Sequence, residues 1–144
     1  MKPLPILALF ATLACAQYAG PKTVYILPMA AGLDQYLAQA LTRDHVLQVV
    51  ADPKAAEVVM TDTLGQSFEQ RMKEIMPLSD SKKSDDSATH GAFRSTRARG
   101  TIFLVDAKSR QVLWSNYQKP PSLNSDRNLN REAGEIVKKL AGKN

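Results

Sequence analysis

Residues 100–118 read GTIFLVDAKSRQVLWSNYQ, and this stretch has the pattern of a β-hairpin. Two apolar runs, 102–105 and 112–114, have the composition of short strands, and the polar segment DAKSRQ separates them. The aspartate and serine of that segment can hydrogen-bond the backbone of a turn. The stretch therefore predicts two antiparallel strands. These strands would form part of a sheet against which helices predicted elsewhere in the chain can pack.

Upstream of this hairpin, some segments have the apolar pattern of strands and others have the apolar spacing of a helix. Residues 22–29, KTVYILPM, hold a near-continuous apolar run that ends at Pro28, which is typical of a strand covered on both faces. Residues 46–52 and 57–62 predict two further strands, and DPKAA between them predicts a turn or one short helical turn. Between the first and second strands an amphipathic helix is expected, with a stripe formed by Leu33, Tyr36, Leu37, Ala40 and Leu41.

A second helix is predicted from residue 64 to the proline at 77. Its apolar stripe consists of Leu64, Phe68, Met72, Ile75 and Met76. Residues 79–99 then contain almost no large apolar side chain and are rich in Ser, Asp, Lys and Arg. Such a segment buries too little surface to offset the entropy of ordering it, so we expect a disordered loop here.

The C-terminal segment predicts a third amphipathic helix. Its capping residue is Asn128 or Ser125, and basic side chains in its last turn suit the negative end of the helix dipole. The expected fold class is α+β: a mixed sheet of about five strands with two to three helices, in the order β-α-β-β-α-loop-β-β-α. The stripe of the third helix consists of Leu129, Ala133, Ile136, Val137 and Leu140.

The first 16 residues have the layout of a secretory signal peptide. One positive charge at Lys2 precedes an uncharged apolar run, 4–13, that is too short to cross a bilayer as a helix. Ala14 and Ala16 form a small-residue cleavage site, so we expect cleavage before Gln17 and a single α/β domain over residues 17–144. A buried N-terminal helix is the alternative, and two prolines in its first turn disfavour it.

Cys15, the only cysteine, leaves the mode of processing open. The sequence TLAC matches a lipoprotein signal in part, so lipidation at Cys15 is one outcome and plain cleavage, which removes the cysteine, is another. A chain that is not cleaved is the third. We therefore expect a periplasmic or secreted protein, or an outer-membrane-associated one if Cys15 is lipidated. No transmembrane helix is expected after the signal is removed.

The chain is mildly basic. It has 19 Lys and Arg against 14 Asp and Glu in 144 residues, and loss of Lys2 with the signal leaves an excess of four. That excess falls short of the clustered charge of a dedicated nucleic-acid binder, and export separates the protein from nucleic acid. It does leave open the binding of anionic envelope polymers.

Two features are candidates for recognition of a partner. In FRSTRARG, Arg94, Arg97 and Arg99 alternate with small side chains, as in a segment that holds phosphate or meets an acidic partner; a solvated linker is the alternative. Trp114, the only tryptophan, either packs against the sheet or faces outward as an anchor. Aromatic residues in short strands more often pack, so the hairpin is expected to close the sheet.

Catalytic and cofactor motifs are missing from the sequence. His45 ends a predicted helix and His90 falls in the expected loop, together with the adjacent Asp85 and Asp86. Acid–base chemistry needs groups held at a fixed separation, and the chain has neither a metal-ligand spacing nor a glycine-rich phosphate loop. The sequence therefore predicts a non-enzymatic protein without cofactor or metal.

The pattern over residues 22–140 resembles a class of small bacterial envelope domains. The similarity is carried by VYILPM, VLQVVAD, KAAEVVMTDTLG and IFLVDAKSRQVLWS, followed by the C-terminal helix. Members of the class include the N-terminal domain of TolB and the lipoproteins LpoB and CsgG. The resemblance implies a non-enzymatic part that binds other envelope proteins or assembles. It does not imply a propeller or a pore, because the segments that form them are missing here.

The leading hypothesis is an exported, non-catalytic binding or assembly module of the bacterial cell envelope with a protein partner. The alternatives are an exported enzyme with an unrecognised site and a peripheral lipoprotein that binds anionic envelope polymers.

Overall fold

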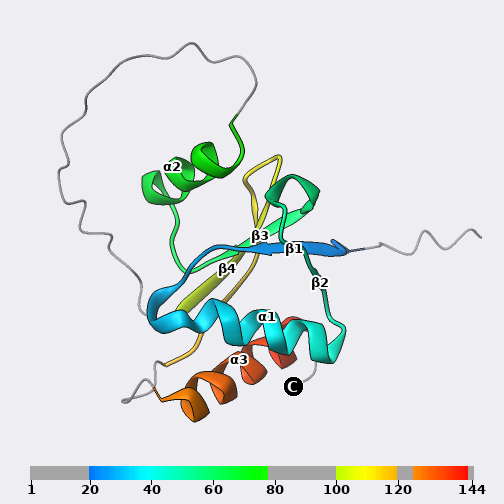
Figure 1. The fold of residues 1–144 in the computed structure, drawn as a ribbon, viewed down its shortest axis with the longest axis vertical. Coiled ribbons are helices and arrows are strands. Elements are labelled where there is room, and N and C mark those ends of the chain that lie inside the picture. The colour runs from blue at the N-terminus through cyan, green and yellow to red at the C-terminus, as the bar shows by residue number, and fades with distance from the viewer. Residues whose placement is uncertain (1–19, 78–99, 120–124, 143–144) are drawn as a thin grey trace, which may run out of the picture.

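The computed structural model describes residues 20–77, 100–119 and 125–142, in which one mixed sheet lies between two layers of helix (Figure 1). This confirms the predicted α+β class and the predicted order of elements. The helices are α1 (Leu33–Asp44), α2 (Gln66–Ile75) and α3 (Asp126–Leu140). The strands are β1 (Thr23–Ile26), β2 (Gln48–Val49), β3 (Val58–Thr61), β4 (Thr101–Asp106) and β5 (Val112–Tyr117).

The five strands lie in the order β2-β1-β3-β4-β5. β1 is parallel to both of its neighbours, whereas β3 with β4 and β4 with β5 are antiparallel. All four residues of β3 are buried, because this strand is central and both of its faces are covered. β5 is therefore an edge strand.

Helices α1 and α3 cover one face of the sheet. Ile136 of α3 and Leu37 of α1 are fully buried in the shared cluster, which also takes in Met60 from β3. The hydroxyl of Tyr36 donates to Asp126 at 2.8 Å and links the first turns of the two helices. This hydrogen bond raises the pKa of Tyr36.

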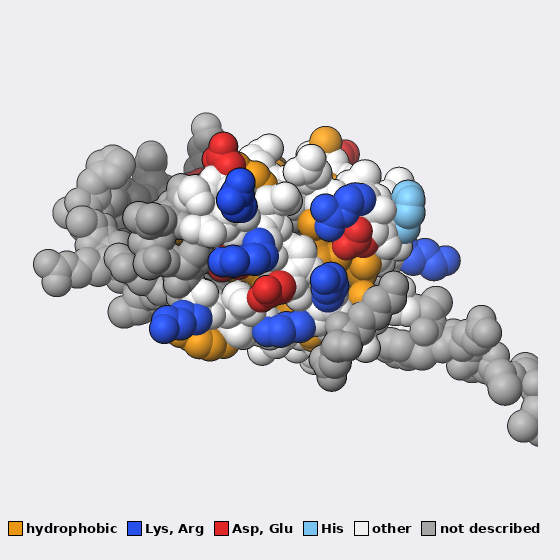
Figure 2. All heavy atoms as spheres, turned by 90° about the horizontal axis from the view of Figure 1, so that it is seen from below, with side chains coloured by type: hydrophobic (Ala, Val, Ile, Leu, Met, Phe, Trp, Pro, Cys, Tyr) orange, Lys and Arg blue, Asp and Glu red, His pale blue; other side chains and the backbone are white. Residues whose placement is uncertain are grey.

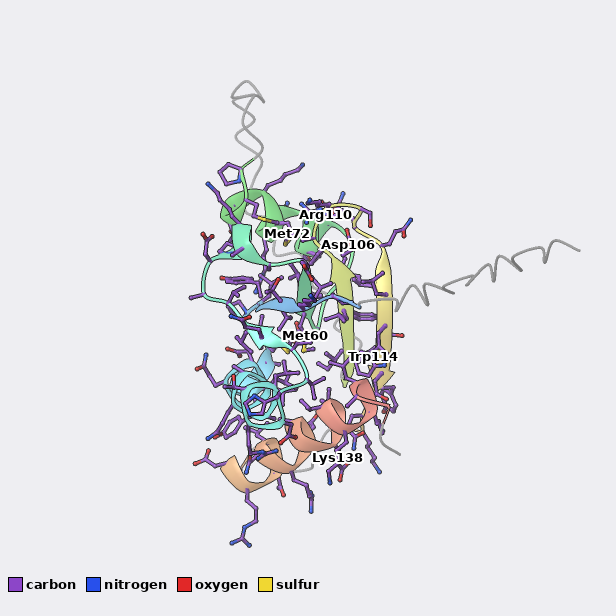
Figure 3. The ribbon with its side chains drawn as sticks, turned by 90° about the vertical axis from the view of Figure 1, so that its right-hand side faces the viewer. Met60, Met72, Asp106, Arg110, Trp114 and Lys138 are labelled. Carbon is purple, nitrogen blue, oxygen red and sulfur yellow. The ribbon has the colours of Figure 1, made fainter. Side chains whose placement is uncertain are left out.

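Helix α2 covers part of the opposite face. Its buried side chains, Phe68 and Met72, pack on Val59 and Val105 of the two central strands. Met60 and Met72 consequently lie on opposite sides of the sheet (Figure 3). The described core is thus two apolar clusters separated by the sheet.

Local side-chain chemistry sets the element ends. The Ser125 hydroxyl accepts from the Asn128 N–H at the start of α3, which resolves the two predicted caps in favour of Ser125. The carboxylate of Asp52 accepts from the Lys54 N–H, and a short 3₁₀ turn, Pro53–Ala55, forms where DPKAA predicted one. His45 ends α1 in the left-handed conformation, at φ 52°.

Two details differ from the sequence prediction. The strand expected over residues 46–52 is only the two-residue β2, because the turn that follows it begins at Asp52. Leu64 was expected in the stripe of the second helix, but it precedes that helix and is 41% exposed. Gly65, at φ 76°, lies between Leu64 and the helix and breaks the helical repeat there, so Leu64 is not part of the stripe.

The predicted signal peptide over residues 1–16 and the predicted loop over residues 79–99 lie outside the described residues. Among the described helices, none combines the length and the apolar content required to span a bilayer.

Candidate protein-binding surface

The outer edge of β5 offers backbone hydrogen-bonding groups. Within the described residues no strand pairs with this edge. The Gln118 N–H donates to the Gly100 carbonyl at 2.7 Å, so the backbone of Gln118 faces β4. Alternate residues of an antiparallel strand turn these groups to opposite edges, so Asn116 also faces β4. The N–H and C=O groups of Ser115 and Tyr117 consequently face away from the sheet.

Exposed apolar side chains are concentrated on the same strand. Four large apolar side chains are exposed among the described residues, and three of them belong to β5: Val112 at 46%, Leu113 at 45% and Tyr117 at 63%. Single exposed apolar residues need no explanation, but a group on one edge strand is typical of an interaction surface. We call the outer edge of β5 with these three side chains the β5 edge.

A bulge determines which way the side chains of β5 point. Leu104 pairs with Trp114 and Val105 pairs with Val112, so Leu113 is an extra residue on β5. Trp114 is half-buried and packs against the cluster under α1 and α3. Leu113 and Trp114 both line a cavity on that side, whereas Val112 lies opposite Val105, whose side chain belongs to the α2 cluster.

The cavity beside β5 has a volume of about 430 Å³ and an apolar lining. It lies between the end of α3 and the β4–β5 hairpin, and Figure 3 shows Trp114 on this side of the molecule. Apolar walls that open next to an unpaired strand can receive a large apolar side chain. The lining consists of Pro21, Val46, Leu47, Leu104, Leu113, Trp114, Leu140 and Ala141.

Basic residues flank β5, which itself carries no charge. Lys119 is exposed just beyond the C-terminal end of the strand. At the other end, the guanidinium of Arg110 lies 6.0 Å from the centre of the Phe68 ring and its Nε is 3.9 Å from Glu69. Its Nη1 is buried without a hydrogen-bond partner. Lys119 therefore favours negative charge on a neighbour, and Arg110 does so to the extent that Glu69 leaves its charge uncompensated.

The turn between β4 and β5 is rigidly built. The Asp106 carboxylate accepts from the backbone N–H groups of Ser109 at 2.7 Å and Lys108 at 3.0 Å, as the sequence predicted for this aspartate (Figure 3). The hydrogen bonds from Ser109 lower the pKa of Asp106, with smaller contributions from Lys108. Arg110 follows at φ 63°, a left-handed conformation that closes the turn.

Side-chain hydrogen bonds also hold the far end of β5. The Gln118 amide donates to Glu135 at 2.7 Å, and the Nζ of Lys139 donates to Gln118 at 2.9 Å. Both partners belong to α3, so the end of the hairpin is fixed to a helix. Asn116 retains a buried Nδ2 with no acceptor. The β5 edge is therefore held in an extended conformation before any partner arrives.

The described residues include one histidine, His45, and one buried acid, Glu132. Among them, no three His, Cys, Asp or Glu side chains gather closely enough to hold a metal ion. His45 lines a second cavity of about 350 Å³, whose other lining residues are Thr42, Leu47, Gln48 and Val49, so that cavity brings no acid to the imidazole. Glu132 is 8% exposed on α3, where burial, and secondarily the charge of Glu135, raise its pKa.

Charges of both signs are interspersed on the outer surface of the α1 and α3 layer (Figure 2). Blue side chains predominate over red ones across the face in this view, and Arg43 forms an ion pair with Asp44 at 2.8 Å. A polyanion gains most from a surface of one sign. The excess of basic side chains on this face therefore leaves the polymer-binding alternative open.

Of the residues proposed in the sequence for partner binding or lipidation, only Trp114 lies in the described part of the chain. Its side chain packs against the cluster under α1 and α3, as expected for the packing role, and it also lines the cavity. Cys15, Arg94, Arg97 and Arg99 lie outside the described residues. Val112, Leu113 and Tyr117 were not singled out, and the one signal for them was the apolar composition of the second strand.

Comparisons of the chain with protein-family models, with curated proteins and with solved structures found no match.

Proposed function

We propose that this chain is an exported, non-catalytic binding or assembly module of the bacterial cell envelope, and that the β5 edge receives a protein partner. The observation that supports the proposal most directly is the concentration of exposed apolar side chains on one unpaired strand. The apolar cavity beside Trp114 extends the same surface. Export is supported by the N-terminal sequence, and the envelope by the resemblance described above.

Site-specific photo-crosslinking in the exporting cell tests this proposal. A photoreactive phenylalanine replaces Tyr117 on the β5 edge, and in a matched control it replaces Gln39, which is exposed on α1. We expect one adduct of defined mass at Tyr117 and none at Gln39. No adduct at either position, or the same set of adducts at both, would contradict a protein-binding role for the β5 edge.

A variant distinguishes the β5 edge from the basic segment that the sequence singled out. Arg97→Ala removes the central arginine of FRSTRARG and leaves β5 intact. The adduct at Tyr117 should persist in this variant. Its loss would move the binding site to the arginine segment.

A further inference from the structure

The backbone of the β5 edge restricts the shape of what can bind there. The outward N–H and C=O groups of Ser115 and Tyr117 are separated by two residues of extended chain, about 6.8 Å. Donors and acceptors alternate along this line, and another extended chain presents the complementary alternation. A helix satisfies its own backbone groups, so it cannot pair with this edge.

Side chains beside the edge then set which residues the extended chain carries. A strand that lies next to β5 turns alternate side chains to each face of the sheet. On one face they meet Val112 and Tyr117, which α2 leaves exposed. On the other they lie next to Trp114 and the apolar cavity. Both faces therefore favour apolar side chains in the middle of the incoming strand.

Charge decides between a second copy of this chain and a different partner. An antiparallel pairing of β5 with β5 of a second copy brings the Arg110 end of each strand toward Lys119 of the other, and Glu69, at 3.9 Å from Arg110, offsets only part of the positive charge there. Like charges that face each other across paired strands destabilise the pairing. A strand with acidic residues at both ends instead places opposite charges next to these basic residues, which stabilises the pairing.

Resting on the protein-binding role proposed above, we infer that the partner is a different protein that adds an extended segment to the β5 edge. The segment is apolar in its middle, acidic at its ends, and places one large apolar side chain in the cavity beside Trp114. It extends the five-stranded sheet by one strand.

A proline at position 115 separates strand pairing from ordinary side-chain contact. Ser115→Pro removes an outward N–H and leaves the hydrogen bonds between β4 and β5 in place, as proline on an edge strand allows. Ser115→Ala is the matched control, because it removes the hydroxyl and keeps the N–H. The probe is a synthetic ten-residue peptide of alternating Leu and Thr with two Glu at each end, and its binding is followed by the fluorescence of Trp114.

We expect Ser115→Ala to bind this peptide as the parent does and Ser115→Pro to bind it about tenfold more weakly, the loss expected for one hydrogen bond and a blocked edge. The two variants should melt alike. A second peptide, methylated at every backbone amide, keeps the side chains and charges but cannot donate. It should bind to the parent more weakly than the unmethylated peptide does. This comparison tests backbone pairing even if Ser115→Pro does not fold.

A peptide with Lys at its ends in place of Glu should bind more weakly, and the difference should shrink as salt is added. Equal binding of all peptides, or of the two Ser115 variants, would refute strand pairing. In the cell, the Tyr117 adduct should be lost in Ser115→Pro and kept in Ser115→Ala. An adduct that is kept in both Ser115 variants refutes the inference, while the proposed function stands. An adduct of twice the chain's mass assigns the edge to a second copy and refutes a different partner. The lack of any adduct refutes the inference and the proposed function together.

Discussion

Replacing Ile136 with alanine tests whether α3 is part of the core. Ile136 is fully buried between α1 and the sheet. The change removes three buried carbon atoms, worth about 2.4 kcal/mol at about 0.8 kcal/mol for each methylene. The cavity left behind adds to this loss of stability, whereas the higher helix propensity of alanine restores about a few tenths of a kcal/mol. We expect a loss of about 3 kcal/mol from the free energy of unfolding.

A loss of this size is readily measured. Domains of this size have roughly 5–15 kcal/mol of stability, so about 3 kcal/mol is a large fraction of the total and lowers Tm by about 10 to 20 °C. Urea unfolding followed by circular dichroism, with Trp114 fluorescence as a second probe, gives the difference. Coincident transitions of the two probes would show that helices and hairpin unfold as one unit.

Lys138→Ala is the control on the same helix, because Lys138 is exposed (Figure 3). It should change the free energy of unfolding by less than about 0.5 kcal/mol. If Ile136→Ala cost less than about 1 kcal/mol, or no more than Lys138→Ala, then α3 would not pack against α1 and the sheet. The arrangement of the β5 edge relative to α3 would then have to be revised as well.

Three further predictions concern other parts of the chain. Burial and Glu135 raise the pKa of Glu132, so the folded state holds a proton that the unfolded state has released, and stability falls as pH rises from the ordinary glutamate range through the raised pKa. Glu132→Gln should remove this fall in urea titrations between about pH 4 and pH 8, and an unchanged pH profile would contradict the assignment. Trp114→Ala should cost about 1.5 to 3 kcal/mol, less than a fully buried tryptophan, and unchanged melting would show that its packing contributes nothing. Intact mass of the exported protein should place the first residue at Gln17, and a lipid adduct on Cys15 would overturn that prediction.

Local patterns in the sequence were sufficient for the elements of this fold. Apolar stripes at helical spacing predicted α1 and α3, and the buried side chains of these two helices belong to the stripes, with the exception of Glu132. The turns were equally predictable, since the carboxylates of Asp106 and Asp52 accept hydrogen bonds from backbone N–H groups of their own turns. Each of these signals lies within one continuous segment of the chain, so it can be read without knowing where the rest of the chain lies.

The errors arose where tertiary position overrode local pattern. Leu64 fits the stripe of α2 by spacing, but the left-handed Gly65 separates it from the helix. The apolar run after residue 45 suggested a full strand, yet only Gln48 and Val49 find a pairing partner on β1. A periodic pattern shows which residues can lie on one face, and neighbouring elements decide how far that face extends.

The β5 edge was not predictable for the same reason. The run Val112, Leu113, Trp114 predicts a strand, but an apolar run is expected of a strand buried on both faces as well as of one that binds a partner. Two tertiary facts separate these cases here: the strand order puts β5 outermost, and α2 packs on β3 and β4 without covering Val112 and Tyr117.

Edge strands in monomeric proteins are usually protected by charged side chains, proline or a bulge. β5 has only the bulge, at Leu113, and that bulge turns an apolar side chain toward the cavity instead of ending the pairing. The nearest basic residues, Arg110 and Lys119, stand outside the strand and leave the outward backbone of Ser115 and Tyr117 uncovered by charge. The edge is therefore unprotected along its middle, which is the feature that the inferred pairing with a strand of another protein requires.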